Sequence, residues 1–191
     1  MEDIYSGIII YLIGYSGVGK SAISKEIVKL TGIKNIDQGL VFDLIYKIVN
    51  KSEKVKQRST KHVSSIWLIM LDAILDICRM HQSFVITDQL FQENEMHKKL
   101  YEKVESIASK RGSIFVPVKI ECKKEVIIER HASPERQLEL KSISRVEALK
   151  NCTENMLIDV RHPNLITIDV SKLSAKESAI EIVERIEQYL Y

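Results

Sequence analysis

Cysteine is scarce in this sequence, and its spacing gives it no shared role. The 191 residues contain three cysteines, Cys78, Cys122 and Cys152, which lie far apart. An odd number at such separations excludes a disulfide framework and matches no zinc-ligand spacing. We therefore interpret the three as small apolar side chains in a protein of a reducing compartment.

A long apolar run is also missing. The longest runs, at 8–13 and 66–71, are far shorter than the roughly 20 residues needed to cross a bilayer. The first residues, Met1-Glu2-Asp3, are acidic where a secretory signal is basic. We expect a cytoplasmic protein.

An excess of charge of one sign is absent as well. The chain has 28 basic and 26 acidic residues, a formal net charge of +2. No overall field attracts nucleic acid or an anionic membrane, so such a partner would need a local patch. Hydrophobic residues make up 45% and charged residues 28%, which excludes collagen-like and disordered classes. The length suits one domain, residues 1–191.

What the sequence does contain is a regular alternation of short apolar runs and helical patterns. This alternation predicts an α/β fold of three layers, a five-stranded parallel sheet with helices on both faces. Strands are expected at 8–13, 33–36, 84–87, 114–120 and 165–168. Helices are expected at 20–30, 40–49, 65–80, in a charged stretch ending near 110, and at two later starts with capping boxes, Ser144 with Glu147 and Ser174 with Glu177.

Two details of this pattern carry further expectations. Pro117 lies inside the fourth strand, and because proline lacks a backbone N–H it favours an edge or a bulge there. The last helix is expected to bury one stripe against the sheet, formed by Ala179, Ile180, Val183 and Ile186.

Residues 51–61 break the charge balance. Five basic residues face only one acid, Glu53, within this stretch. A solvated connector explains such a composition. The alternative is a flap that attracts phosphate above an acceptor site.

The strongest motif is Gly14-Tyr15-Ser16-Gly17-Val18-Gly19-Lys20-Ser21, which matches G-x-x-x-x-G-K-[ST]. Its glycines let backbone N–H groups point inward around a phosphate, and the following helix presents its positive end to the same anion. Lys20 can reach the β- and γ-phosphates, and the Ser21 hydroxyl can bind Mg²⁺. The motif predicts a nucleoside triphosphate site but leaves ATP and GTP open.

Three uses of the triphosphate compete: phosphoryl transfer, a GTPase switch and a motor-type ATPase. A GTPase needs Asp-x-x-Gly and Asn-Lys-x-Asp, and the nearest approach to the second motif is Asn50-Lys51-Ser52-Glu53, with the wrong acid. A motor ATPase usually has two adjacent acids after a strand, whereas the third strand here ends Thr87-Asp88-Gln89. Phosphoryl transfer is therefore favoured.

Four features of the sequence together resemble those of the small P-loop kinases. They are the phosphate loop, an acid after the second strand (Asp37), Asp88 after the third strand, and 122–130 followed by Pro134-Glu135-Arg136. That group contains shikimate kinase, gluconate kinase, chloramphenicol phosphotransferase and polynucleotide kinase. The resemblance implies a kinase that uses ATP and Mg²⁺ to phosphorylate a hydroxyl of a small molecule. Where shikimate kinase has a glycine-rich turn, this chain has Thr87-Asp88-Gln89-Leu90, so the acceptor stays open.

The resemblance also implies roles for single residues. Asp37 would orient the acceptor hydroxyl and take its proton, although a helix cap is the alternative explanation. Asp88 would help to hold Mg²⁺ or the acceptor. Arg130 would stack on a base held near 170–173, and Arg136 would contact the transferring phosphate from a lid at about 131–141. Lys141 and Arg145 are further candidates, and His131 in the lid could touch phosphate.

A second class of function stays open. The protein could instead bind nucleotide for regulation, or act on nucleic-acid ends as polynucleotide kinase does, with the basic stretch 51–61 as support. The sequence does not predict an oligomeric state.

Overall fold

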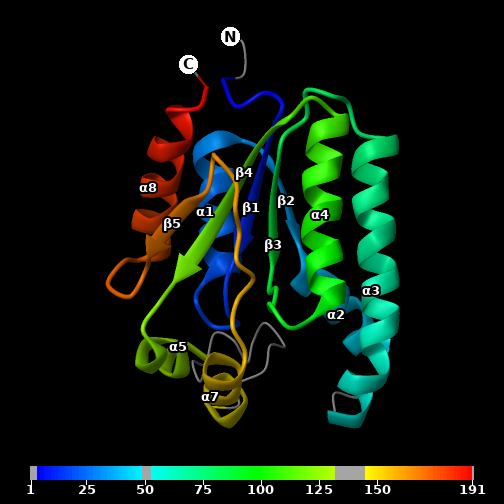
Figure 1. Ribbon diagram of the computed structural model, residues 1–191, viewed down its shortest axis with the longest axis vertical. Helices are drawn as coiled ribbons and strands as arrows, with labels where there is room; N and C mark the ends of the chain where they lie inside the picture. The colour runs from blue at the N-terminus through cyan, green and yellow to red at the C-terminus, as the bar shows by residue number, and fades with distance from the viewer. Residues whose placement is uncertain (1–3, 49–52, 132–144, 191) are drawn as a thin grey trace.

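A computed structural model describes residues 4–48, 53–131 and 145–190. Five parallel strands form one sheet in the order β2-β3-β1-β4-β5, and helices cover both of its faces (Figure 1). The three-layer α/β fold expected from the alternating pattern is thus confirmed. The strands are β1 Ile8–Ile13, β2 Lys34–Asp37, β3 Phe84–Asp88, β4 Ile114–Glu121 and β5 Ile166–Asp169. The helices are α1 Lys20–Thr31, α2 Gln38–Ile48, α3 Glu53–Asp76, α4 Glu95–Lys110, α5 Lys124–His131, α7 Arg145–Glu154 and α8 Ala175–Glu187.

Strand β1 is apolar throughout because it lies in the middle of the sheet and is buried on both faces. Ile8, Ile10 and Leu12 pack into the core shared with α1 and α8. The alternate residues Ile9, Tyr11 and Ile13 pack into the core shared with α3 and α4.

The order of the strands switches at β1: β3 and β2 lie on one side of it, and β4 and β5 lie on the other. All five strands point the same way, so their carboxyl ends meet at one edge, toward the bottom of Figure 1. In open α/β sheets, ligands bind at this edge next to such a switch point.

Helix α3 corrects the expected connector. It begins at Glu53 rather than near residue 65, so residues 53–61 form its first turns. The stretch 53–61 contains no glycine or proline and is rich in lysine, glutamine and arginine, which favour helix. Nothing in its composition therefore ends the helix before the buried residues Val63, Trp67 and Leu71. Residues 51 and 52 lie outside the described part of the chain.

Pro117 lies in an interior strand, which corrects the edge or bulge expected for it. Strand β4 pairs with β1 from Ile114 to Lys119, and its register with β5 starts only at Val118. The Phe115 carbonyl faces the β5 side, where it accepts a hydrogen bond from Asn164 Nδ2 (3.0 Å). The backbone polar groups of residues 115 and 117 face the same neighbouring strand. The N–H that Pro117 lacks would therefore face β5 at a point where β5 has not yet begun to pair.

Helix α8 confirms one capping box and shifts the expected stripe. The Ser174 hydroxyl accepts from the Glu177 N–H, and the Glu177 carboxylate accepts from the Ser174 N–H. The buried face includes Ala179, Ile182 and Val183, whereas Ile180 is 37% exposed. Ile180 was therefore wrongly included in the stripe. The other capping box begins at Ser144, outside the described residues.

Arg111 stabilises the connection between α3 and β3, a role the sequence did not reveal. Its side chain is 3% exposed, and its guanidinium lies 5.4 Å from the centre of the Phe84 ring. It donates to the backbone carbonyls of Ile74, Cys78, Arg79, Met80 and Gln82. These carbonyls include one at the C-terminal end of α3, which the helix itself leaves without a donor.

None of the helices in the described part of the chain is both long and apolar enough to cross a membrane.

Candidate functional site

The phosphate loop lies between β1 and α1, at the middle of the carboxyl edge. Gly17 and Gly19 have φ angles of 95° and 105°, a backbone region that other residues rarely adopt. Helix α1 starts after Gly19, without a side-chain cap and without an acidic residue in its first turn. No side-chain cap and no acid from this turn therefore cover the positive dipole end of α1, the end that the motif assigns to a phosphate.

Lys20 folds back over the loop. Its Nζ donates to the carbonyl oxygens of Gly14 (2.7 Å) and Tyr15 (2.9 Å). The ammonium is thus held by polar backbone atoms beside the place where the motif puts the β- and γ-phosphates. A triphosphate would replace these neutral acceptors with charged ones, which form stronger hydrogen bonds.

Helix α5 packs directly on the loop. A Cβ atom placed on Gly17 would lie 3.1 Å from the Ile127 carbonyl oxygen and 3.3 Å from His131 Cδ2. Ser16 Oγ lies 3.4 Å from His131 Nε2. His131 is 1% exposed and ends α5, so it is a packed helix residue, which corrects the placement of the lid's first residue. The remaining lid residues 132–141, with Arg136 and Lys141, lie outside the described residues.

Arg130 joins the phosphate loop to the segment that follows β5. Its guanidinium donates to the carbonyls of Val18 (3.1 Å), Val170 (3.0 Å) and Leu173 (3.2 Å). The sequence placed a nucleotide base near 170–173, and Arg130 does border that segment. The contacts themselves hold two loops together.

Asp37 ends β2 and caps α2. Its Oδ1 accepts from the Gly39 N–H (2.9 Å) and from the Thr87 hydroxyl (2.9 Å). The cap that was the alternative explanation for Asp37 is therefore present. The same two bonds set the orientation of the carboxylate at the carboxyl edge of the sheet.

Asp88 ends β3 and lies deep inside the protein, 2% exposed. Its Oδ2 accepts from the Tyr11 hydroxyl (3.0 Å) and its Oδ1 from the Gln89 N–H (2.8 Å). Burial raises the pKa of Asp88 to about 6, although these hydrogen bonds and the charge of Lys20 oppose the rise. The indole N–H of Trp67 has no hydrogen bond within 3.5 Å, yet it lies near enough to Asp88 to lower that pKa slightly.

The two carboxylates belong to opposite faces of the sheet. Asp37 is in register with Thr87, and Asp88 is the next residue along β3. Successive strand residues point to opposite faces, so Asp37 lies on the α1 side, while Asp88 lies with Tyr11 on the α3 side. The structure therefore brings both acids to one edge but does not pair them.

One tyrosine, Tyr11, was missed as a contributor to the site, and Tyr15 of the loop makes contacts that the sequence did not predict. Tyr11 is the hydroxyl-bearing residue in the otherwise aliphatic strand β1, which was the available signal. Tyr15 was predicted only as a member of the loop. Its hydroxyl donates to the Asn155 carbonyl (2.8 Å), and its ring lies 6.2 Å from that of Phe91. Tyr15 thus links the phosphate loop to the chain after α7 and to the loop after β3.

The oxygen-bearing side chains beside the phosphate loop suit a magnesium ion that binds together with a nucleotide. Among the described residues, no group of three or more His, Cys, Asp and Glu side chains could hold a metal ion. Mg²⁺ in phosphoryl-transfer sites usually takes one or two protein oxygens, with waters and phosphate oxygens completing its shell. Ser21 in the first turn of α1 and Asp88 near Lys20 fit that pattern.

No protein-family model and no curated protein matches the sequence. Solved structures do match it. A candidate kinase from Chloroflexus aurantiacus superposes with a TM-score of 0.68 at 12% identity, covering 95% of this chain and 96% of that one. A gluconokinase from Sinorhizobium meliloti superposes with a TM-score of 0.62 at 18% identity, covering 96% and 94%. A shikimate kinase from Acinetobacter baumannii, in complex with shikimate, gives 0.59 at 14% identity, covering 95% and 94%. At these identities the likeness shows the fold, which is that of the small P-loop kinases, as the sequence predicted.

Proposed function

We propose that this protein is a kinase that transfers the γ-phosphoryl group of ATP to a hydroxyl of a small molecule. The observation that carries the proposal is the arrangement of charge at one edge of the sheet. Lys20 and the uncapped start of α1 form a cationic centre after β1. The carboxylates of Asp37 and Asp88 end the two neighbouring strands beyond it. A phosphate donor on the loop would face an acceptor held by acids.

The loop and Lys20 bind and orient the donor. Backbone N–H groups of the loop and the first turn of α1 would surround the β-phosphate, and Lys20 would exchange its two carbonyl partners for phosphate oxygens. Bound Mg²⁺ neutralises charge on the phosphates, and Ser21 with Asp88, acting through water, are the residues that would hold it. Most of the rate enhancement would come from alignment and electrostatics.

Asp37 is the proposed base. The acceptor hydroxyl gives its proton to the Asp37 carboxylate while its oxygen forms a bond to the γ-phosphorus. The bond between that phosphorus and the bridging oxygen breaks, and ADP leaves with the electron pair. The bonds from Gly39 and Thr87 hold the carboxylate in one orientation, so the cap and the base are compatible roles.

Arg130 and Arg136 are proposed to act on the nucleotide. Arg130 already borders the Val170 and Leu173 carbonyls, where the base would rest. Arg136 would meet the transferring phosphoryl group, whose charge spreads over three oxygens in the transition state.

Similar structures and this chain's own departures from shikimate kinase support one class of acceptor. The gluconokinase and the shikimate kinase are named for small hydroxylated acids, which supports an acceptor of that kind. Shikimate itself is disfavoured, because Thr87-Asp88-Gln89-Leu90 replaces the glycine-rich turn of shikimate kinase.

A screen of hydroxylated metabolites for ADP release in the presence of Mg-ATP tests the proposal. We expect ADP release that depends on one class of acceptor. Release at the same rate without any acceptor would identify an ATPase instead.

The variant Asp37→Asn separates the two roles of that residue. Asparagine caps helices about as well as aspartate, so folding stability should change by less than about 1 kcal/mol. ATP-dependent thermal stabilisation should persist while acceptor-dependent turnover falls about 100-fold or more, because the base is lost. Wild-type turnover in this variant would show that Asp37 is only a cap.

A further inference from the structure

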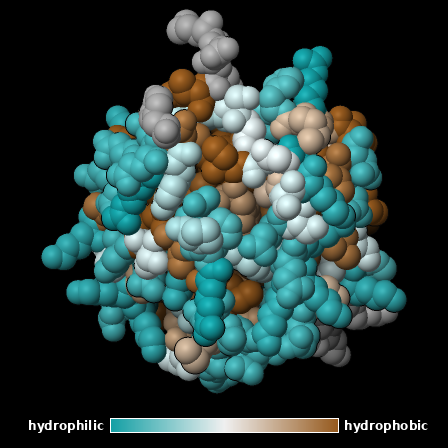
Figure 2. All heavy atoms as spheres, turned by 45° about the horizontal axis from the view of Figure 1, so that its top comes forward, coloured by the Kyte–Doolittle hydropathy of each residue, from teal (hydrophilic) through white to brown (hydrophobic). Residues whose placement is uncertain are grey.

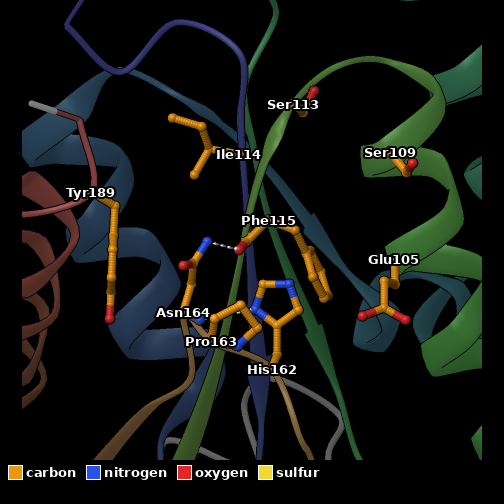
Figure 3. A pocket seen from close by; sticks show the side chains of 9 residues that line it. All are labelled: Glu105, Ser109, Ser113, Ile114, Phe115, His162, Pro163, Asn164 and Tyr189. Atoms are coloured by element: carbon orange, nitrogen blue, oxygen red, sulfur yellow. Dashed lines mark hydrogen bonds between the residues drawn. The ribbon is translucent and has the colours of Figure 1, made fainter.

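A second concave site lies at the opposite edge of the sheet from the phosphate loop. It is a pocket of about 480 Å³ at the amino end of β4, lined by residues of α4, of β4, of the turn before β5 and of the segment after α8 (Figure 3). Figure 2 shows the molecule with this edge turned forward, where hydrophobic atoms reach the surface between polar ones. Nothing in the proposed phosphoryl transfer uses this pocket.

The polar groups at the floor of the pocket have defined hydrogen-bonding roles. His162 Nδ1 accepts a hydrogen bond from the Asn164 N–H (3.1 Å). Asn164 Nδ2 donates to the Phe115 carbonyl, which leaves the amide oxygen Oδ1 as an acceptor. Ser113 Oγ is buried and has no hydrogen-bond partner in the described structure.

Glu105 is the charged residue of the pocket. It projects from α4 on the side facing Phe115 and His162 (Figure 3). The pKa of Tyr101, one turn earlier on α4, is raised mainly by the burial of Tyr101 and secondly by the negative charge of Glu105. Among the described residues, Glu105 has no ion-pair partner, and no lysine or arginine lines the pocket. The local charge is therefore negative and uncompensated by a side chain of the pocket.

Aromatic rings form the walls around this carboxylate. The Phe115 and His162 rings meet edge to face, 5.2 Å apart at 85°. Tyr189 lies on the other side of the pocket from Glu105 (Figure 3). Ring faces attract cations electrostatically, and they bind apolar surface.

We propose that this pocket binds a small organic cation, an ammonium group on an aromatic or apolar body. The ammonium would pair with the Glu105 carboxylate at one side of the pocket, while the body of the ligand would extend past the His162 and Phe115 rings toward Tyr189 on the other side. A carboxylate or phosphate ligand is disfavoured, because Glu105 would repel it and no side-chain cation is present among the described residues of the pocket to bind it.

Three matched probes test the charge requirement. Tyramine, tyrosol and 4-hydroxyphenylacetate share a 4-hydroxybenzyl body and carry a cationic, a neutral and an anionic end, respectively. Isothermal titration calorimetry on the full chain should show tyramine binding at least about tenfold tighter than either other probe. Equal binding of tyrosol, or no tyramine binding up to about 10 mM, would overturn the proposal.

A pair of variants on one helix locates the site. Glu105→Gln should weaken tyramine binding at least about tenfold, because it removes the anion with little change of shape. Glu102→Gln, at an exposed position that does not line the pocket, should leave the affinity within about twofold. Near-ultraviolet circular dichroism confirms that both variants keep the native packing. Unchanged binding in a folded Glu105→Gln variant would also overturn the proposal.

Discussion

Asp88 places an ionisable group in the interior, where its charge is costly. Its pKa is raised from 3.8 to about 6, with burial as the largest cause. As the pH rises from about 4 to about 6, the unfolded chain releases this proton before the folded one does. The contribution of Asp88 to the free energy of unfolding is therefore largest below about pH 4. It declines between about pH 4 and about pH 6, by about 3 kcal/mol in total.

The variant Asp88→Asn provides the measurement. Urea unfolding of both proteins, without nucleotide or divalent cation, gives the stability difference between them at each pH. We expect wild type to lose about 3 kcal/mol relative to the variant between pH 4 and pH 7, with little change above that. A difference that is flat, or that rises with pH, would show that Asp88 ionises normally.

Lys20 is predicted to carry most of the nucleotide affinity. At 100 times its Kd, Mg-ATP stabilises a protein by about 2.7 kcal/mol, which for this size raises the Tm by roughly 5–10 °C. Lys20→Ala should nearly abolish that shift. Lys29→Ala, an exposed lysine near the end of the same helix, should retain it. Stabilisation of the Lys20→Ala variant by the wild-type amount would contradict the loop assignment.

At the scale of elements, the phosphate loop depends on α5. Glycine at position 17 serves two purposes, since its φ is 95° and a Cβ atom there would lie only 3.1–3.3 Å from atoms of α5, which would have to shift. Gly7 has a φ of 69°, and a Cβ atom added there would meet nothing within 4 Å, so this position requires glycine only for its backbone. Substitutions at these two glycines therefore distinguish two contributions to the free energy of unfolding: backbone strain alone at position 7, and backbone strain plus displacement of α5 at position 17.

Gly17→Ala and Gly7→Ala test this dependence. Gly7→Ala should destabilise the fold by about 1 kcal/mol, the cost of a left-handed backbone. Gly17→Ala should cost about 2–3 kcal/mol in urea unfolding, because the crowded contact adds to the same strain. It should also reduce the Mg-ATP thermal shift. Equal destabilisation by the two changes would mean that α5 yields without cost.

At the scale of the whole molecule, the nearly balanced charge argues against nucleic acid as the acceptor. The net charge is +2, and the basic stretch 53–61 forms the start of α3. Fluorescence anisotropy with a labelled single-stranded oligonucleotide should show no saturable binding up to about 10 μM protein at about 150 mM salt. Tight binding that weakens steeply with salt, and that is lost on changing Lys54, Lys56 and Lys61 to glutamine, would instead favour an enzyme of polynucleotide ends.

The sequence by itself determined the strands, most helices and the phosphate loop. Those features depend on local patterns: a buried strand needs a continuous apolar run, and the loop needs glycine at positions such as Gly17 and Gly19. The start of α3 and the place of Pro117 were missed, because each depends on how far a neighbouring element extends.

Only the tertiary structure decided how the site is assembled. Asp37 and Asp88 follow neighbouring strands, but the register places them on opposite faces of the sheet. The Tyr11 bond to Asp88, the Arg130 bonds between two loops and the pocket around Glu105 join residues far apart in the chain. Such contacts leave no local pattern in the sequence, because packing of distant elements creates them.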